Sequence, residues 1–186
     1  MQREERKKHL IKDFTIAFSE NGIDRTSIKK LAKAADINEA SIYQYFKNKD
    51  DIIVECVRQY FSNIEDGLFP VVADPAKPLH ERLAYVLSYS GEMAGPCNFV
   101  CQVIANPLYS RMCEPIIGGF LSGIRAVGDA LSAESGIGQE EIMPIVFLYL
   151  GAVSMGRIIN DDKTLLMQTD YLEGILKSRW QGGGVQ

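Results

Sequence analysis

Residues 26–49, TSIKKLAKAADINEASIYQYFKNK, limit more than any other stretch what this chain can fold into. Apolar side chains recur there at i, i+3, i+4 and i+7, which predicts a short amphipathic helix with its lysines in water. This stripe consists of Ile28, Leu31, Ala32 and Ala35. Thr26 is the expected N-cap of this helix, and Asp36 and Ile37 form the turn after it.

A second helix of about seven residues is expected after the turn, with Asn38 as its N-cap and with Ile42 and Phe46 facing inward. Its outward face then carries Glu39, Ala40, Ser41, Tyr43, Gln44 and Tyr45. Helices this short have marginal stability unless they pack against other elements. We therefore expect the exposed face of this helix to carry a function. Two helices joined by a tight turn form a helix-turn-helix, which lays its second helix in the major groove of DNA.

Residues 6–53 resemble the DNA-binding domain of the tetracycline-repressor (TetR) family. The shared features are a first helix ending in AFSENG, the TS that opens the next, the YxYF of the recognition helix, and Lys49 followed by acids. The family usually has glycine at two positions where this sequence has other residues. These are Asp36 in the turn and Ala40 in the recognition helix. Glu39 either accepts from a cytosine amino group or favours the helix N-terminus through its dipole.

The resemblance implies a set of DNA-binding positions in this sequence. It implies that Thr26 and Lys49 bind phosphate, and that Asn38, Ser41, Tyr43 and Gln44 face bases or phosphates. The full predicted set is Thr26, Ser27, Asn38, Glu39, Ala40, Ser41, Tyr43, Gln44, Tyr45 and Lys49. The basic run at Arg3, Arg6, Lys7 and Lys8 is either a solvated helix end or a further phosphate contact.

Charge is divided unevenly along the chain. Residues 1–49 hold 11 Lys and Arg against 7 Asp and Glu, whereas the remaining residues carry a net charge of −8. A DNA-reading segment joined to a body that does not read DNA is expected to show this split, because the phosphate backbone supplies most non-specific affinity.

The chain is predicted to be all-α with about nine helices, because it shows no alternating strand pattern and no internal repeat. We expect a helix-turn-helix DNA-binding domain over residues 1–49 and a linking helix over 50–68. A helical effector-binding and dimerisation domain is expected over 70–186. The boundary lies at FPVVADPAKP, where three prolines interrupt the helical pattern.

Catalytic and cofactor motifs such as HExxH, a P-loop, GxSxG, GxGxxG or CxxC do not occur, so neither an enzyme nor a cofactor is expected. Cys97, Cys101 and Cys113 are either core residues, which we favour, or a thiol sensor or soft-metal site. No run of 18 apolar residues and no signal peptide occur, so a cytoplasmic protein without a membrane partner is expected.

The helical body is expected to hold a small-molecule site, because tyrosines, phenylalanines and methionines gather between residues 85 and 155. The residues expected to line it are Tyr89, Met93, Phe99, Phe120 and Phe147. Arg82 and Arg125 either pair an anionic ligand or lie on a solvated face, which we favour.

A homodimer is expected because residues 145–159 are too apolar for one small body to cover. Its predicted interface consists of Leu150, Val153, Leu172, Ile175 and Leu176. The resemblance then implies a dimeric repressor that a small apolar or aromatic molecule releases from a palindromic operator. The alternatives are an activator, a ligand-independent DNA-binding protein, a thiol-based sensor, and a protein-interaction module.

Overall fold

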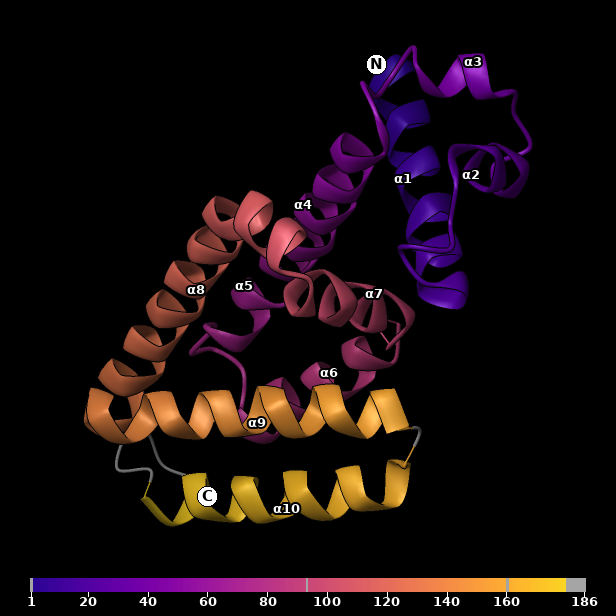
Figure 1. The fold of residues 1–186 in the computed structure, drawn as a ribbon. Helices are drawn as coiled ribbons and strands as arrows, with labels where there is room; N and C mark the ends of the chain where they lie inside the picture. The colour runs from indigo at the N-terminus through magenta and orange to yellow at the C-terminus, as the bar shows by residue number, and fades with distance from the viewer. Residues whose placement is uncertain (1, 93, 160, 180–186) are drawn as a thin grey trace. The chain divides into compact units, whose positions relative to one another are not determined.

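The computed structural model describes residues 2–92, 94–159 and 161–179, and this part of the chain is helical without a strand (Figure 1). The helices are α1 (Gln2–Asn21), α2 (Ile28–Ala34), α3 (Glu39–Ile42), α4 (Lys49–Gly67), α5 (Phe69–Val72), α6 (Leu79–Glu92), α7 (Ala94–Ala105), α8 (Pro107–Ser135), α9 (Gln139–Ile159) and α10 (Asp162–Arg179). The all-α prediction is confirmed.

The helices form two compact units, and α4 and α8 contribute residues to both. The first unit consists of residues 1–63 and 95–118, and the second of residues 64–94 and 119–186. The first unit therefore contains the predicted DNA-binding segment together with α7 and the beginning of α8. The predicted division at residue 70 did not include these later helices in the DNA-binding part.

The first unit is built around the apolar stripe of α1. Phe14 and Phe18 are fully buried, and the Phe14 ring meets Phe46 edge to face with ring centroids 5.8 Å apart. α1 ends as predicted at Gly22, whose φ of 82° is accessible to glycine without steric cost. Its N–H donates to the Phe18 carbonyl at 2.9 Å and closes the helix.

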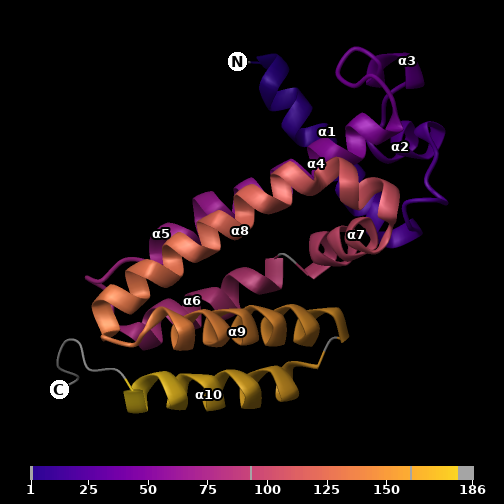
Figure 2. The same cartoon turned by 60° about the vertical axis from the view of Figure 1, so that its left-hand side comes forward.

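The second unit has its own core between α6, α8 and α9. Val86, Val127, Leu131 and Ile142 are buried there, each from an apolar stripe at helical spacing. α9 and α10 run antiparallel side by side, as both views show (Figures 1 and 2). Arg179 and Glu141 form a 2.5 Å ion pair between α10 and α9.

Candidate functional site

α3 is held in place by its N-cap and by buried side chains. Asn38 Oδ1 accepts hydrogen bonds from the backbone N–H and the hydroxyl of Ser41, both at 2.8 Å. Ile42 and Phe46 are buried, and Asp36 turns the chain with a φ of 51°, a conformation that Asp tolerates better than most residues. The predicted turn, cap and inward residues are confirmed, but the α-helix ends at Ile42 and is only four residues long.

Several of the predicted DNA-reading residues share an exposed surface on and after α3. Glu39, Ala40, Tyr43 and Gln44 are exposed, and 56% of Tyr43 is accessible to solvent. Tyr45 is half-buried. We call this surface the recognition segment, meaning Glu39, Ala40, Tyr43, Gln44 and Tyr45.

Arg3 lies beside the recognition segment. Its Nη2 donates to the Gln44 carbonyl at 2.9 Å, and its guanidinium lies 5.9 Å from the centroid of the Tyr45 ring. The sequence showed Arg3 only as part of a basic run. Because 41 residues separate it from Gln44, no local pattern could have paired them.

Two predicted phosphate ligands instead support the turn after α1. Ser27, not Thr26, is the N-cap of α2, and it accepts from the Lys30 N–H at 3.3 Å. Thr26 is fully buried and donates to the Gly22 carbonyl at 2.7 Å, so its side chain lies beneath the surface that a phosphate could reach. Lys49 is half-buried, and its Nζ donates to the Ile23 carbonyl at 2.6 Å.

α7 completes the packing of the first unit. Phe99 is fully buried and stacks on Phe18 with centroids 5.4 Å apart, so it belongs to this core and not to a cavity in the body. Gln102 Oε1 accepts from the Ile23 N–H at 3.2 Å. The turn between α1 and α2 is therefore fixed from a helix about 80 residues further along.

The beginning of α8 also contacts the first turn of α4. Tyr109 is buried, and its pKa is raised, first by burial and then by Asp50, whose carboxylate accepts its hydrogen bond. This contact is a polar link between α8 and the helix that follows the recognition segment.

Cys56, Cys97, Cys101 and Cys113 are free thiols. Cys97 and Cys113 are buried and Cys101 is exposed, and the described residues contain no cluster of three or more His, Cys, Asp or Glu that could hold a metal. Burial raises the pKa of Cys101, and the neighbouring Cys97 raises it further. Burial also raises the pKa of Cys113, and that of Cys56 to about 12. Thiols with a raised pKa stay protonated at neutral pH, which disfavours a sensing role. The core role fits the buried Cys97 and Cys113 but not the exposed Cys101.

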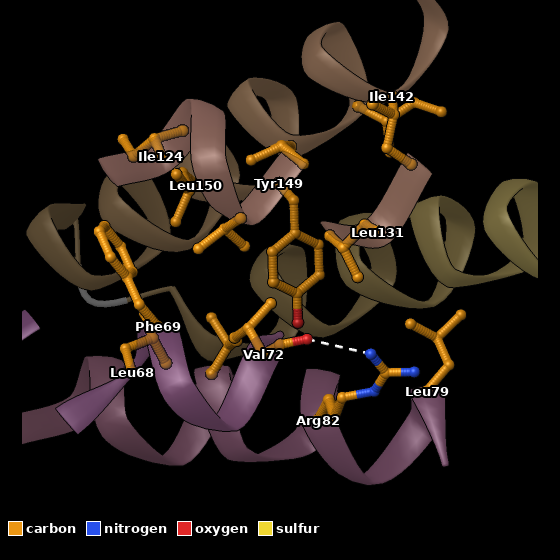
Figure 3. A pocket seen from close by; sticks show the side chains of 14 residues that line it. Leu68, Phe69, Val72, Leu79, Arg82, Ile124, Leu131, Ile142, Tyr149 and Leu150 are labelled. Atoms are coloured by element: carbon orange, nitrogen blue, oxygen red, sulfur yellow. Dashed lines mark hydrogen bonds between the residues drawn. The ribbon is translucent and has the colours of Figure 1, made fainter. Parts of the chain in front are cut away.

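The second unit encloses a cavity of about 60 Å³ between α5, α6, α8 and α9 (Figure 3). Figure 3 shows the Tyr149 ring crossing this cavity, with the hydroxyl directed to the side where Val72 and Arg82 lie. Of the fourteen described residues that line it, thirteen are apolar or aromatic. They are Leu68, Phe69, Val72, Leu79, Val86, Ile124, Val127, Leu131, Ile142, Ile145, Val146, Tyr149 and Leu150.

Arg82 is the charged member of this lining. Its Nη1 and Nη2 donate to the two carboxylate oxygens of Glu134 at 2.9 and 2.5 Å, and Nη1 also donates to the Val72 carbonyl at 3.0 Å. The side chain of Arg82 is 2% exposed. The favoured solvated role for Arg82 is therefore wrong, because the ion pair to α8 lets the guanidinium be buried.

Among the described residues that were predicted to line a ligand site, none lies in the wall of this cavity. Phe120 stacks on the lining residue Phe69 with centroids 5.6 Å apart, and Tyr89 packs against the core cluster. Phe147 is exposed, and Met93 lies outside the described residues. The sequence therefore predicted the helices that form the cavity better than the side chains that line it.

α9 and α10 expose a large apolar surface, which we call the α9–α10 face. It consists of Phe147, Leu148, Met155, Ile159, Leu166, Met167 and Tyr171. Of the predicted dimer residues, Leu150 lines the cavity and Ile175 packs against the core cluster, so both point inward. The side chains of Val153, Leu172 and Leu176 lie outside the described residues.

Among the described helices, α8 alone is long and apolar enough to cross a membrane by length and composition. A single helix of this kind is weak evidence, because core helices of globular proteins pass the same test. Ile124, Val127 and Leu131 of α8 lie in the wall of the cavity.

Residues 16–56 match the model of the bacterial regulatory proteins of the tetR family. The HTH-type transcriptional regulator AcrR of Shigella flexneri is 33% identical over 92 residues, which span 46% of this chain and 42% of AcrR. The HTH-type transcriptional repressor DhaR of Mycobacterium sp. (strain GP1) is 22% identical over 98% of this chain and 82% of its own length.

The fold is also that of a solved regulator. The Bacillus subtilis transcriptional regulator FadR, crystallised with stearoyl-CoA, superposes with a TM-score of 0.64 and 20% identity over 96% of this chain and all of that one. The proteins matched are regulators and not enzymes. The family model covers residues 16–56, which include α2, α3 and the recognition segment. Residues 16–56 of this chain are a regulatory segment of the tetR family, and the chain as a whole shares the fold of solved regulators.

Proposed function

We propose that this protein is a ligand-responsive repressor that binds a palindromic operator as a homodimer in the cytoplasm. The observation that carries the proposal is the presence, in one chain, of an exposed recognition segment and a separate apolar cavity. The first is suited to reading base edges in a major groove. The second is suited to a small apolar or aromatic effector.

The effector acts by a shift in populations. A ligand changes operator affinity only if it binds the DNA-free state of the protein better than the DNA-bound state. FadR was crystallised with stearoyl-CoA, in which an apolar chain is joined to a polar head, and DhaR is a repressor. Both relatives support the proposed mode of action without naming the effector of this chain.

The proposed dimer is formed through the α9–α10 face. Exposed apolar surface of this extent marks an interaction site, and most soluble oligomers are two-fold symmetric dimers. A Cβ built on Gly151 or Gly174 would meet nothing within 4 Å, so the partner's helices can approach closely there. Two recognition segments about 34 to 36 Å apart would then read two half-sites of a palindrome.

A salt-dependent gel shift on DNA from upstream of the protein's own gene tests the proposal. A DNA reader loses affinity steeply as salt rises, whereas a protein-interaction module does not bind the DNA at all. A repressor lowers transcription from that DNA in a reconstituted assay, and an activator raises it. Binding without any response to a broad set of apolar molecules would leave a ligand-independent DNA-binding protein.

A further inference from the structure

We propose that the cavity takes an amphipathic carboxylic acid, whose carboxylate replaces Glu134 on Arg82 while its apolar chain fills the space between α5, α6, α8 and α9. The inference rests on the proposed function, because it assigns a chemical class to the effector of that cavity. In the cavity wall, Arg82 is a buried cation among thirteen uncharged described residues.

The Arg82–Glu134 pair is buried unequally. The side chain of Arg82 is 2% exposed, whereas that of Glu134 is 23% exposed. Arg82 therefore cannot reach water without a large rearrangement, but Glu134 already touches it. If the pair separates, Glu134 is the partner that leaves.

A buried guanidinium needs a carboxylate or a comparable acceptor, because an unpaired charge in an apolar interior is strongly unfavourable. An incoming carboxylate supplies the same two acceptor oxygens that Glu134 now offers to Nη1 and Nη2. The exchange keeps Arg82 paired and returns Glu134 to water. Arg82 lines the cavity, so a ligand that enters it and displaces Glu134 can reach these donors.

The exchange also changes which helices are joined. Glu134 lies near the end of α8, and Arg82 lies on α6 with its second bond to the Val72 carbonyl of α5. Replacing Glu134 removes the bidentate ion pair between α6 and α8. The hydrogen bond from Arg82 of α6 to the Val72 carbonyl of α5 remains. The ligand therefore has a different affinity for the paired and the separated arrangement, as an effector must.

The size of the cavity agrees with a site that opens on binding. Its volume of about 60 Å³ is well below the ~150 Å³ of an apolar cavity that holds benzene. A chain longer than a few carbons must move the walls. The departure of Glu134 frees α8 to move.

Binding of matched probes tests the inference directly. Straight-chain carboxylates from butanoate to decanoate are titrated into the full-length protein at neutral pH, alongside the primary alcohols of the same length. An apolar cavity alone favours the alcohol, because a carboxylate loses much of its hydration on burial. Pairing with Arg82 reverses this order, and we expect at least one carboxylate to bind about tenfold more tightly than its alcohol.

Two variants separate the role of the pair from the role of the cavity. Glu134→Gln removes the competing carboxylate, so the affinity for the carboxylate rises about tenfold and that for the alcohol stays the same. Formate, which has no chain, raises the melting temperature of this variant more than that of the parent protein. Arg82→Met combined with Glu134→Gln keeps the site neutral, loses the preference for the carboxylate and keeps binding of the alcohol.

Three outcomes overturn the inference. The first is an alcohol that binds the parent protein as tightly as its carboxylate, and the second is an unchanged carboxylate preference in the double variant. In either case, release of operator DNA by a neutral molecule leaves the proposed repressor intact. The third is that no probe binds and no apolar molecule releases DNA, which overturns the ligand response as well.

Discussion

Gln102 of α7 accepts a hydrogen bond at Oε1 from the backbone N–H of Ile23, 3.2 Å away, and so ties α7 to the turn between α1 and α2. The same turn is bound from the other side by Lys49, which donates to the Ile23 carbonyl. Both polar groups of one backbone residue are thus satisfied by distant side chains. The orientation of α2 depends on contacts that lie outside the helix-turn-helix itself.

Gln102→Met is expected to lower the free energy of unfolding by about 0.5 to 1.5 kcal/mol, because it leaves the partly buried Ile23 N–H without its acceptor. Gln102→Glu keeps an acceptor oxygen at this position and is the matched control. Denaturant unfolding measures both. Equal losses in the two variants would mean that packing, and not the hydrogen bond, explains the effect.

Arg3 and Gln44 are expected to contribute differently to DNA binding. Arg3→Gln removes an exposed cation beside the recognition segment, so the slope of log affinity against log salt falls by about 1. Lys77→Gln, an exposed charge change in the second unit, should leave the slope unchanged. Titrations of labelled operator DNA at several salt concentrations measure these slopes.

Gln44→Ala is expected to relax the preference at one base position, with a loss of about 1 to 3 kcal/mol if its contact with the base is bidentate. A library of operators with single base changes reports this loss. Tyr43, exposed on the same segment, gives a second variant in Tyr43→Ala. Parent-like specificity in both variants would contradict the assignment of the recognition segment to the major groove.

Gly123→Ala and Gly119→Ala form a matched pair within α8. A Cβ on Gly119 would meet nothing within 4 Å, so that variant gains about 0.5 to 1 kcal/mol from helix propensity. A Cβ on Gly123 would lie 2.6 Å from Phe69 Cε2 in the cavity wall. Overpacking there lowers stability by about 1 to 3 kcal/mol relative to Gly119→Ala. Thermal unfolding compares the two, and equal stabilities would contradict the close packing of Phe69 on α8.

The ion pair between Lys7 and Glu55 is expected to make stability depend on pH. Burial raises the pKa of Glu55, but the hydrogen bond and charge of Lys7 and the contact with Arg58 outweigh it and lower the pKa below its ordinary value of 4.5. A lowered carboxyl pKa stabilises the folded state above about pH 4.5, and this stability is lost as pH falls through the folded-state value.

Glu55→Gln should therefore be less stable at neutral pH and lose less stability on acidification than the parent protein. Glu4→Gln, at an exposed position of α1, is the control. Chemical denaturation at pH values on both sides of the ordinary Glu pKa measures how the free energy of unfolding of the parent and of the variant changes with pH. Parallel pH profiles for parent and Glu55→Gln would show that the pair makes no contribution.

The cysteines are expected to react slowly at neutral pH. Because burial raises the pKa of Cys101 and Cys113, few thiolates are available to attack iodoacetamide. Cys101 should react first because it is exposed, and Cys101→Ser should remove this first phase. Labelling followed by mass spectrometry measures the order. Rapid modification of Cys101 with release of operator DNA would instead support the thiol-sensor alternative.

Local patterns predicted the helices and most of the recognition segment, because periodicity and capping act over a few residues. The N-cap of α2 was misplaced by one residue because Thr26 and Ser27 are both good caps, and only the packing on Gly22 distinguishes them. Phe99 was expected to line a ligand site, but it packs on Phe18, which lies 81 positions earlier in the sequence.

The cavity wall was harder to predict for the same reason. Arg82 was expected on a solvated face, and no Asp or Glu stands three or four residues from it, where a helix would bring the two together. Glu134, which pairs with it, is 52 residues away. Leu150 and Phe147 belong to the same apolar helix, and periodicity alone could not decide which side faces the cavity and which faces outward.

The packing of α7 on α1 limits how this protein could exchange parts with its relatives. A recombination event at residue 70 would transfer the helix-turn-helix without Phe99 and Gln102, leaving Phe18 uncovered and the Ile23 N–H without its acceptor. A functional chimera would have to carry residues 95–118 along with residues 1–63. The parts of the gene that encode the first unit, which includes the helix-turn-helix, are therefore not contiguous.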